Sequence, residues 1–526
     1  MKNCLSLALL CLVTLPGVAV ALGASPFEGD AAPVPPGEID RLVFAQLNRL
    51  GIPPAAPCSD AVFVRRVFLD VIGTLPNTLE ARDFILDRSP NKRRDLIDRL
   101  LARDEFADYW AMKWSDLLRV KAEFPVNLWP NAAQAYHHWI RASIRENQPY
   151  DQFARALLTA SGSNFRDPPV NFYRAMQNHD PQGIAQTVAL TFMGVRAEQW
   201  PSNQLHGLAA FFAQVGFKST SEWKEEIIFN DPAGTNVAAY LGAARQATFP
   251  GGERVKLPAD RDPRAVFADW LITPENPWFT RNLANRVWSW LLGQGIIHEP
   301  DDLRADNPPS NPELLACLEH ELVAAHYDWR ALFRLILNSQ TYQLSSISGS
   351  AAPAAVTNFA SYPVRRLDAE VLIDAINQLT SSSEKYSSAI PEPFTFIPDG
   401  SRAIALPDGS ITSPFLELFG RPSRDTGLEA ERNSRITASQ RLHLLNSTQI
   451  QRKLEQSRMV AVQSQSKQPP REVATLIYLS ILSRYPTEEE LKAVVAYASS
   501  GRVKAREAVL DLAWALMNSA EFLYRH

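Results

Sequence analysis

A helical pattern is clearest in residues 38–50, Glu-Ile-Asp-Arg-Leu-Val-Phe-Ala-Gln-Leu-Asn-Arg-Leu. Its apolar side chains recur every three or four residues, which is the spacing of one face of an α-helix. They are Ile39, Leu42, Val43, Leu47 and Leu50. Most of the chain repeats this spacing, so we predict a mainly α protein: a non-repetitive multi-helical array in two lobes with at most a small β ribbon.

Start signals agree with helices, because Thr78 offers an N-cap and Pro312 follows Asn311 at a first turn. The predicted helices cover residues 60–70, 78–87, 92–101, 104–120, 131–147, 150–159, 183–193, 203–213, 263–272, 278–292, 312–325, 329–338, 368–379, 439–456, 471–483, 487–498 and 504–519.

Strand signals are few, the best being Glu226–Phe229 and Arg254–Leu257, which together could form one ribbon. Residues rich in Gly and Pro predict a linker at 246–262, between a first helical domain at 38–245 and a second at 263–526. Within the second domain we expect irregular loops at 345–363 and 381–414, the latter packed on the surface.

Composition excludes several classes of protein. The 526-residue chain has a formal charge of −4 and is 46% hydrophobic, as is usual for a globular protein. There is no basic footprint for nucleic acid. The phosphate-cradling Gly-rich loop, the dinucleotide-binding glycines and the hydrolase elbow are missing from the sequence, so no catalytic residue, metal site or cofactor is predicted.

Residues 1–24 have the pattern of a secretory signal: Lys2, an apolar stretch, and a small-x-small cleavage site at Ala19-Val20-Ala21. We therefore expect export to the periplasm or cell surface of a bacterium, with no transmembrane segment after cleavage. Cleavage leaves Cys58 and Cys317, which could form one disulfide in an oxidising compartment or remain free, with Cys317 packed in the core.

Two acidic or histidine-containing stretches have residue types that can bind a metal ion. His320-Glu321 precedes His326, but six residues place the two rings on separate helix faces. Asp301-Asp302 could offer oxygen ligands to calcium, or could be solvated or capping carboxylates. Neither stretch is taken as a metal site.

Many short motifs occur in an order that resembles a known pair of families. Those in the first half are Arg65-Arg66-Val-Phe-Leu-Asp-Val-Ile-Gly-Thr-Leu-Pro76, Trp114-Ser-Asp-Leu-Leu-Arg119 and Phe192-Met-Gly194. Those in the second half include Asn285-Arg-Val-Trp288, Asp301-Asp302, Arg366-Leu-Asp-Ala-Glu370 and Phe419-Gly-Arg-Pro422. The chain resembles the planctomycete surface cytochrome domain (PSCyt2 type) followed by the planctomycete surface domain (PSD1 type).

The sequence departs from the resemblance at two places, both of which lack the expected cysteines. Members of the first family typically carry Cys-x-x-Cys-His after the Phe-x-Gly element, which attaches a c-type haem. Here residues 192–212 contain no cysteine, and a Cys-rich segment expected after Phe419-Gly-Arg-Pro422 is also without sulfur. Covalent haem attachment is therefore impossible, and we expect a member that has lost the haem motif.

Charged and aromatic side chains crowd the segment where the haem motif would be. The candidate binding residues there are Arg196, Glu198, Trp200, His206, Lys218, Glu222, Trp223, Glu225 and Glu226. A second candidate cluster is Arg421, Arg424, Glu431 and Arg432. Aromatic faces flanked by polar groups suit sugar rings or the anchor residues of a partner. The alternative is that Trp200 and Trp223 are packed and that the charges form surface pairs.

These observations predict an exported, haem-less binding or assembly protein of the cell envelope, with an envelope protein or a polysaccharide as partner. The alternative is a hydrolase or accessory protein in the breakdown of extracellular polysaccharide, in keeping with the setting that the resemblance implies.

Overall fold

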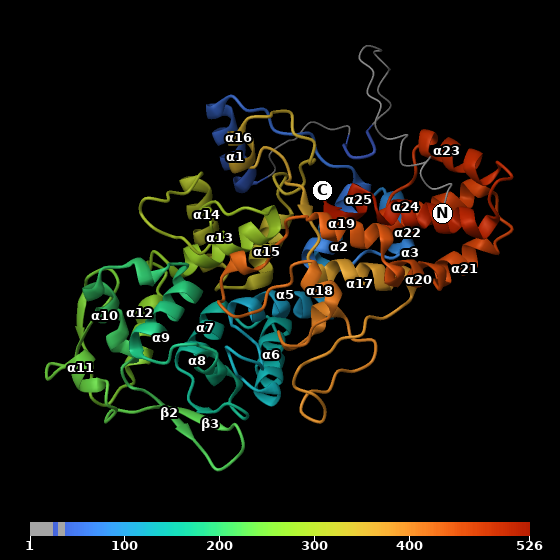
Figure 1. Ribbon diagram of the computed structural model, residues 1–526. Helices are drawn as coiled ribbons and strands as arrows, with labels where there is room; N and C mark the ends of the chain where they lie inside the picture. Colours follow the sequence, from blue (N-terminus) through green and yellow to red (C-terminus); the bar gives the residue numbers. More distant parts are fainter. Residues whose placement is uncertain (1–24, 30–36) are drawn as a thin grey trace.

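The computed structural model describes residues 25–29 and 37–526, and it is mainly α-helical, as predicted (Figure 1). The expected signal sequence at residues 1–24 lies outside the described residues. Within the described part of the chain, no helix has the length and apolar character needed to cross a bilayer.

The helices follow the predicted apolar spacing closely. In the first half they are α1 (Glu38–Leu50), α2 (Asp60–Val71), α3 (Thr78–Leu86), α4 (Lys92–Leu101), α5 (Asp104–Leu117), α6 (Pro130–Arg145), α7 (Tyr150–Leu158), α8 (Asn171–Arg174), α9 (Pro181–Val188), α10 (Ser202–Ala209) and α11 (Val237–Leu241).

The helices of the second half are α12 (Pro263–Leu271), α13 (Phe279–Leu292), α14 (Pro312–Ala324), α15 (Trp329–Leu337), α16 (Pro353–Thr357), α17 (Ala369–Thr380), α18 (Pro414–Leu418), α19 (Ala438–Asn446), α20 (Thr448–Glu455), α21 (Arg458–Ser464), α22 (Pro470–Leu482), α23 (Glu488–Ala498), α24 (Ala505–Met517) and α25 (Ala520–Leu523).

Within residues 25–29 and 37–526, the strands form three small antiparallel sheets instead of one ribbon. The first has the order β1 (Gly162–Ser163), β3 (Glu226–Asn230), β2 (Val215–Ser219). In the second, β4 (Gln246–Thr248) pairs with β5 (Arg254–Lys256), so the predicted linker contains a hairpin. In the third, β6 (Arg365–Arg366) pairs with β7 (Tyr524–Arg525). The two predicted strand segments thus pair with other partners, not with each other.

Local hydrogen bonds explain where the helix boundaries differ from prediction. Asn77, one residue before the predicted N-cap Thr78, accepts the Leu79 and Glu80 N–H groups and forms a capping box with Glu80. The single helix predicted at 439–456 is wrong, because Ser447 interrupts it and caps α20 through the N–H of Gln449 and Ile450.

Two expectations about loops and cysteines can be compared with the structure directly. The segment 381–414 is irregular, but it is not confined to the surface, because Ile404, Leu406 and Ile411 are buried. Cys58 and Cys317 are both free, with Cys58 buried and Cys317 half-buried against the core.

The core is shared between the two halves of the chain. One cluster of buried apolar side chains runs from Ile39 to Leu523. In Figure 1, α2, α3 and α5 lie with α17 and the C-terminal helices, whereas α7 to α12 and the β2–β3 hairpin occupy the other end. The lobes of the molecule therefore do not follow chain order: α22 of the second half contacts α3, and α12 contacts α7.

Candidate functional site

The residues predicted around the missing haem motif are distributed over several elements with different partners. Arg196 forms an ion pair with Glu299, at 3.2 Å. Trp200 is partly buried against the core, Glu198 is exposed, and His206 is exposed on α10, where its ring stacks on Tyr240 with 4.6 Å between centroids. The structure does not gather these side chains into one site.

The remaining residues of that group lie on the β2–β3 hairpin. Lys218, Glu222 and Trp223 are exposed, whereas Glu226 forms a 3.0 Å ion pair with Arg174. Glu225 accepts hydrogen bonds from Ser163 Oγ at 2.6 Å and Thr220 Oγ1 at 2.8 Å, and these bonds hold its pKa below the usual range. The hairpin carboxylates thus act mainly within the fold, and Trp223, which is 68% exposed, is not packed.

The residues at the missing haem motif do not fit a covalently attached haem. Residues 192–212 offer no thiol, and the described cysteines, Cys58 and Cys317, lie on other segments. The π-helical turn Ala189–Met193 is packed through apolar side chains, and so is the later part of α10, through Leu205 and Leu208. No step of chemistry is therefore assigned to a haem on this chain.

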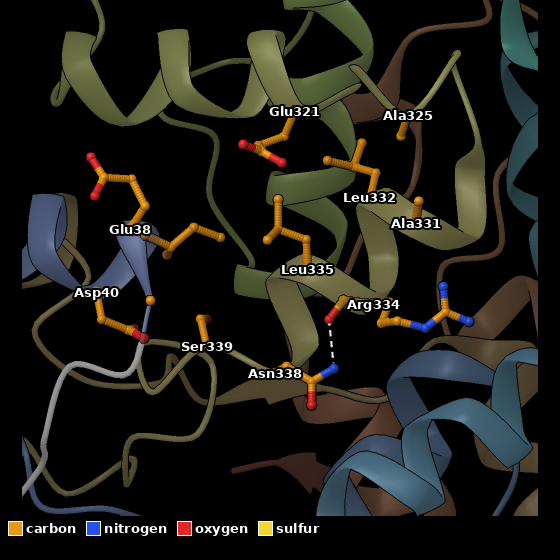
Figure 2. A pocket seen from close by; sticks show the side chains of 12 residues that line it. Glu38, Asp40, Glu321, Ala325, Ala331, Leu332, Arg334, Leu335, Asn338 and Ser339 are labelled. Carbon is orange, nitrogen blue, oxygen red and sulfur yellow. Dashed lines mark hydrogen bonds between the residues drawn. The ribbon is translucent and has the colours of Figure 1, made fainter. Parts of the chain in front are cut away.

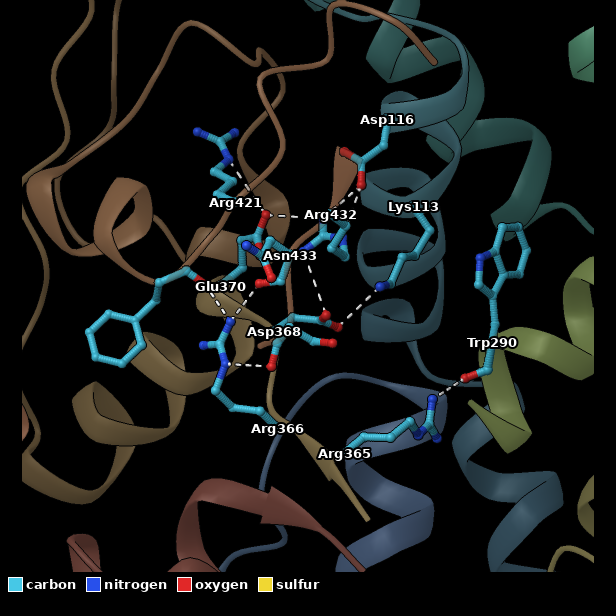
Figure 3. Close-up of polar contacts among 12 residues, drawn as sticks. Lys113, Asp116, Trp290, Arg365, Arg366, Asp368, Glu370, Arg421, Arg432 and Asn433 are labelled. Carbon is cyan, nitrogen blue, oxygen red and sulfur yellow. Dashed lines mark hydrogen bonds and ion pairs between the residues drawn. The ribbon is translucent and has the colours of Figure 1, made fainter. Parts of the chain in front are cut away.

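The second predicted cluster lies inside a large buried network of charges, which we call the arginine network (Figure 3). Asp116 on α5 receives Arg424 Nε at 2.9 Å and Arg432 Nη2 at 2.6 Å. Arg432 also bonds Glu370 at 2.7 Å, and Arg421 lies 3.5 Å from the same carboxylate. Three of the four predicted residues thus share two buried acids.

The fourth residue, Glu431, has a local role. Its carboxylate accepts the backbone N–H groups of Asp425 and Thr426 at 3.0 and 3.2 Å, together with the hydroxyls of Ser423 and Thr426. Burial would raise its pKa, but these hydrogen bonds hold the pKa below the usual value. Glu431 therefore fixes the loop that carries Arg424 and Arg432.

The arginine network joins the two halves of the chain. Asp70 on α2 accepts the hydroxyls of Tyr342 at 2.9 Å and Tyr362 at 2.7 Å, and lies 3.4 Å from both Arg365 and Arg525. Acids of the first half, Asp70 and Asp116, therefore pair with bases of the second. Removing one member of such a buried set leaves an uncompensated charge, which costs far more than breaking a surface pair.

From the sequence, Asp301 could be a calcium ligand or a solvated or capping carboxylate. In the structure its side chain is buried. It bonds Arg286 Nη2 at 2.9 Å and accepts the Glu429 N–H at 2.6 Å. Among residues 25–29 and 37–526, no group of three or more His, Cys, Asp or Glu side chains could hold a metal ion. Asp301 thus positions Arg286 and the loop around Glu429.

A cavity of about 350 Å³ opens on the arginine network, and we call it the cationic pocket. Its ionisable lining comprises six cations, three carboxylates and one histidine: Lys113, Arg365, Arg366, Arg432, Arg435, Arg525, Glu299, Asp368, Glu429 and His298. Lys113 comes from α5, while β6, β7 and the loop before α19 supply the other cations. The pocket therefore lies where the first half of the chain packs against the second, and we call this contact region the seam.

Asp368 and Glu429, two carboxylates of the cationic pocket, are engaged by other groups of the protein. Asp368 receives Lys113 Nζ and Arg525 Nη2, both at 3.1 Å. Burial would raise the pKa of Asp368, but Lys113, Arg525 and Arg432 together hold it well below the usual range. Glu429 accepts the Trp290 indole N–H at 2.9 Å, and burial raises its pKa.

Arg366 is a buried pocket cation that forms no ion pair with the described residues. Its hydrogen bonds go to the carbonyl oxygens of Phe419 at 2.6 Å, Asn433 at 2.7 Å and Ser434 at 3.1 Å. Its Nη1 atom is buried without a hydrogen-bond partner, and burial lowers its pKa. An anion in the pocket would supply the charge that these neutral carbonyls do not.

Arg365 closes the C-terminal end of α13 beside the same pocket. Its guanidinium donates to the carbonyls of Trp290 at 2.8 Å and Leu291 at 2.7 Å, where the helix dipole favours a cation. Gly293, which directly follows α13, has φ +72°, and a Cβ at this position would lie 2.4 Å from Arg365 Cδ. Glycine is thus required both for the left-handed turn and for the approach of Arg365.

A second cavity, of about 490 Å³, has a different character (Figure 2). Its wall includes Ile39, Leu332 and Leu335, while Glu38 at its rim is paired with Arg41. Arg334 bonds Asp98 at 2.6 Å. The ionisable lining of this groove is three carboxylates, Glu38, Asp40 and Glu321, and one cation, Arg334. It lacks the group of buried cations that lines the cationic pocket, so we take the cationic pocket as the candidate site for an anion.

The comparisons with known proteins identify two families in tandem. The model of the PSCyt2 family, which is described as a protein of unknown function (DUF1549), matches residues 38–215. The model of the PSD1 family, which is described as a protein of unknown function (DUF1553), matches residues 263–498. The chain is a PSCyt2–PSD1 protein. The resemblance and its domain order are confirmed. No curated protein and no solved structure matches the chain.

The motifs that carry the PSCyt2–PSD1 resemblance converge on the seam. Asp70 and Asp116 belong to the PSCyt2 motifs, and Arg286, Asp368 and Glu370 to the PSD1 motifs. Sequence reasoning missed Lys113, Arg365 and Arg525 as pocket residues. The signal available for Lys113 was a full charge inside a strongly apolar helix, because such charges are rarely buried unless they are paired. Arg365 and Arg525 lie on the short strands β6 and β7, where no such signal exists.

Proposed function

We propose that this PSCyt2–PSD1 protein is an exported binding protein of the cell envelope and that it holds a small anionic ligand in the cationic pocket. The observation that carries the proposal is the excess of cations over carboxylates in the pocket lining, with buried Arg366 bonded only to neutral carbonyls. Guanidinium groups form strong, directional hydrogen bonds to carboxylate, phosphate and sulfate oxygens.

Electrostatics support an anion as the missing partner. Burial lowers the pKa of Lys113, and the neighbouring Arg432 adds to the effect. Burial thus penalises the positive charges of Lys113 and Arg366, and a bound anion would relieve that penalty. Arg435, exposed at the pocket, adds a further cation that can reach a ligand from the solvent side.

The size of the pocket restricts the ligand to a small molecule. A cavity of about 350 Å³ is at the lower end of the range for small-molecule sites, which is about 300–1,000 Å³. Because Asp368 and Glu429 are engaged by Lys113, Arg525 and Trp290, the pocket favours binding over acid–base chemistry. Polysaccharide hydrolysis stays an alternative without a site of its own.

Binding is tested by titrating the mature protein with inorganic phosphate, sulfate and citrate, against sodium chloride at matched ionic strength. We expect at least one polyvalent anion to raise the melting temperature and to give a saturable calorimetric isotherm, because a ligand that binds only the native state stabilises it. An effect no larger than that of chloride for all three anions would overturn the proposal.

Arg435→Ala is the informative variant, because its side chain is exposed and its loss should not disturb the buried network. We expect affinity to fall by about 3- to 10-fold, consistent with the loss of one partly solvated charge-assisted hydrogen bond. Arg502→Ala, an exposed arginine on another loop, is the matched control and should leave affinity unchanged.

Export is tested separately by sequencing the N-terminus of the protein recovered from the envelope fraction. We expect the mature chain to begin shortly after Ala21, as the small-x-small pattern predicts. Recovery of an uncleaved chain from the cytoplasm alone would contradict the localisation without affecting the test of anion binding.

A further inference from the structure

Three loops bring three aromatic rings together at the surface, and none of these rings lines the cationic pocket. The Trp129 ring lies 6.4 Å from the Trp223 ring, nearly perpendicular to it, and 5.3 Å from the Phe394 ring. Lys224 Nζ lies 5.5 Å from the Trp129 ring centroid and 5.3 Å from that of Trp223. We call Trp129, Trp223 and Phe394 the aromatic platform.

Two of the three platform rings are exposed to solvent, and Trp129 is half-buried. Trp223 is 68% exposed and Phe394 is 48% exposed. Apolar side chains of this size are normally covered, and a cluster of them marks a binding surface far better than a single one does. The loop between β2 and β3 that carries Trp223 projects from the lower edge of the molecule in Figure 1.

Hydrogen bonds hold the loop that carries Trp129. The N–H groups of Leu128 and Trp129 donate to the carbonyls of Lys121 and Ala122, both at 3.2 Å. The Glu123 carboxylate of this loop accepts the Ala389 N–H at 3.0 Å, which ties it to the segment before Phe394.

The other two loops are equally fixed. The Phe394 N–H donates to the Pro391 carbonyl at 3.1 Å, and the Asn164 side chain bonds the Lys224 carbonyl at 3.1 Å. The rings are thus presented by ordered loops, and little conformational entropy is lost when a ligand binds them.

Trp129 also has an unfavourable backbone conformation. Its φ is 72° and its ψ is 147°, a region that a bulky residue avoids at a cost of about 1–3 kcal/mol. Pro130, which begins α6, follows it directly. Such strain persists where the surroundings impose it, and here it aims the indole toward Trp223 and Phe394.

We infer that the aromatic platform binds a neutral oligosaccharide chain. The apolar C–H faces of sugar rings stack on aromatic side chains, and their hydroxyls both donate and accept hydrogen bonds. The platform offers both partners, since Lys224 donates, Glu222 accepts, and the exposed Asn127 amide does either. An uncharged, hydroxyl-rich ligand suits this rim of mixed charge.

The same rim disfavours other occupants. Glu222 and Glu225 on the hairpin, and Glu123 on the Trp129 loop, would oppose an anionic lipid surface or a polyanionic chain. A protein partner would have to bury the exposed charges of Glu222 and Lys224, which are depleted from the centres of protein interfaces.

The test uses the mature protein with cellohexaose, xylohexaose and maltohexaose as probes, followed by tryptophan fluorescence and calorimetry. We expect saturable binding of at least one of them, accompanied by a change in tryptophan emission. Trp223→Ala should lower that affinity by 10-fold or more, because a central aromatic contact dominates such small interfaces. Tyr485→Ala, a partly exposed aromatic on another loop, should change nothing.

Four outcomes would overturn the inference: no binding of any of the three hexasaccharides, binding unaffected by Trp223→Ala, co-sedimentation with phosphatidylcholine vesicles that requires Trp223, or a dimer abolished by Trp223→Ala. Phe394→Ala provides an independent second variant from a different loop and should weaken the same ligand. Anion binding in the cationic pocket should be unchanged in both variants, which separates this test from that of the proposed function.

Discussion

The seam and the aromatic platform invert the usual distribution of side chains. At the seam, the arginine network buries Asp70, Asp116 and Arg366, whereas the platform exposes Trp223 and Phe394. Charges usually stay in water and large aromatics are usually covered. The difference indicates that the buried charges fix how the PSCyt2 and PSD1 segments dock, while the exposed rings are left for a ligand.

Asp70→Ala should reduce the stability of the protein more than the other variants considered. It leaves Arg365 and Arg525 without their buried carboxylate, so we expect the free energy of unfolding to fall by about 3–5 kcal/mol. Urea denaturation measures this. Asp83→Asn, which removes an exposed pair with Arg82, should cost less than about 1 kcal/mol. Equal effects of the two variants would show that the network does not hold the seam.

The pH dependence of stability distinguishes two carboxylates that lie near each other in sequence. They are Asp368 in the arginine network and Asp374 on α17. Burial raises the pKa of Asp374 to about 6, so the folded protein retains a proton that the unfolded chain loses near its ordinary pKa of 3.8. The wild type therefore loses stability as pH rises from about 4 to about 6.

Asp374→Asn removes this loss. We expect the variant to gain about 2 kcal/mol relative to wild type between about pH 4.5 and about pH 7. Asp368 has the opposite sign, because its lowered pKa contributes stability above the ordinary pKa that is lost as pH falls below it. Unfolding curves at both pH values measure the slopes, and parallel slopes for wild type and Asp374→Asn would contradict the assignment.

Gly293→Ala sharpens the account of the pocket wall. A Cβ would collide with Arg365, which bonds the last carbonyls of α13, in addition to the strain of φ +72°. Gly51→Ala has similar strain at φ +66° but nothing within 4 Å. We expect Gly293→Ala to be the more destabilising by about 1–2 kcal/mol in thermal unfolding. A smaller loss than for Gly51→Ala would mean that Arg365 moves freely.

The smallest expected effect is that of Trp223→Ala on stability. Because the side chain is mostly in solvent, we expect the free energy of unfolding to change by less than about 0.5 kcal/mol. The same variant should abolish most saccharide binding. A loss of about 3–5 kcal/mol would instead place the indole among packed core residues.

Helix positions were largely predictable because apolar spacing and capping residues act locally. The sequence did not predict the break between α19 and α20 at Ser447. A serine inside a helical pattern gives a weak signal until its hydrogen bonds are known. The order of the two family segments was predictable from their motifs. Their packing into one core was not, because nothing local indicates that α3 meets α22.

The candidate sites were less predictable because their partners are distant in sequence. Arg424 and Arg432 were found as a cluster, but Asp116 lies about 300 residues earlier. Trp223 was singled out, whereas Trp129 and Phe394 come from loops with no shared pattern. Charges within apolar helices, such as Arg286, were the clue available for the seam.

The division of acids and bases across the seam has a consequence for how the protein can be dissected. The hairpin at residues 246–256 invites an expression boundary, yet a fragment ending there would carry Asp70 and Asp116 with no counterions, and its complement would carry their bare arginines. Each fragment alone should aggregate, and the two co-expressed should reassemble into one soluble particle. Such an outcome would show that the two consecutive family segments fold as one cooperative unit.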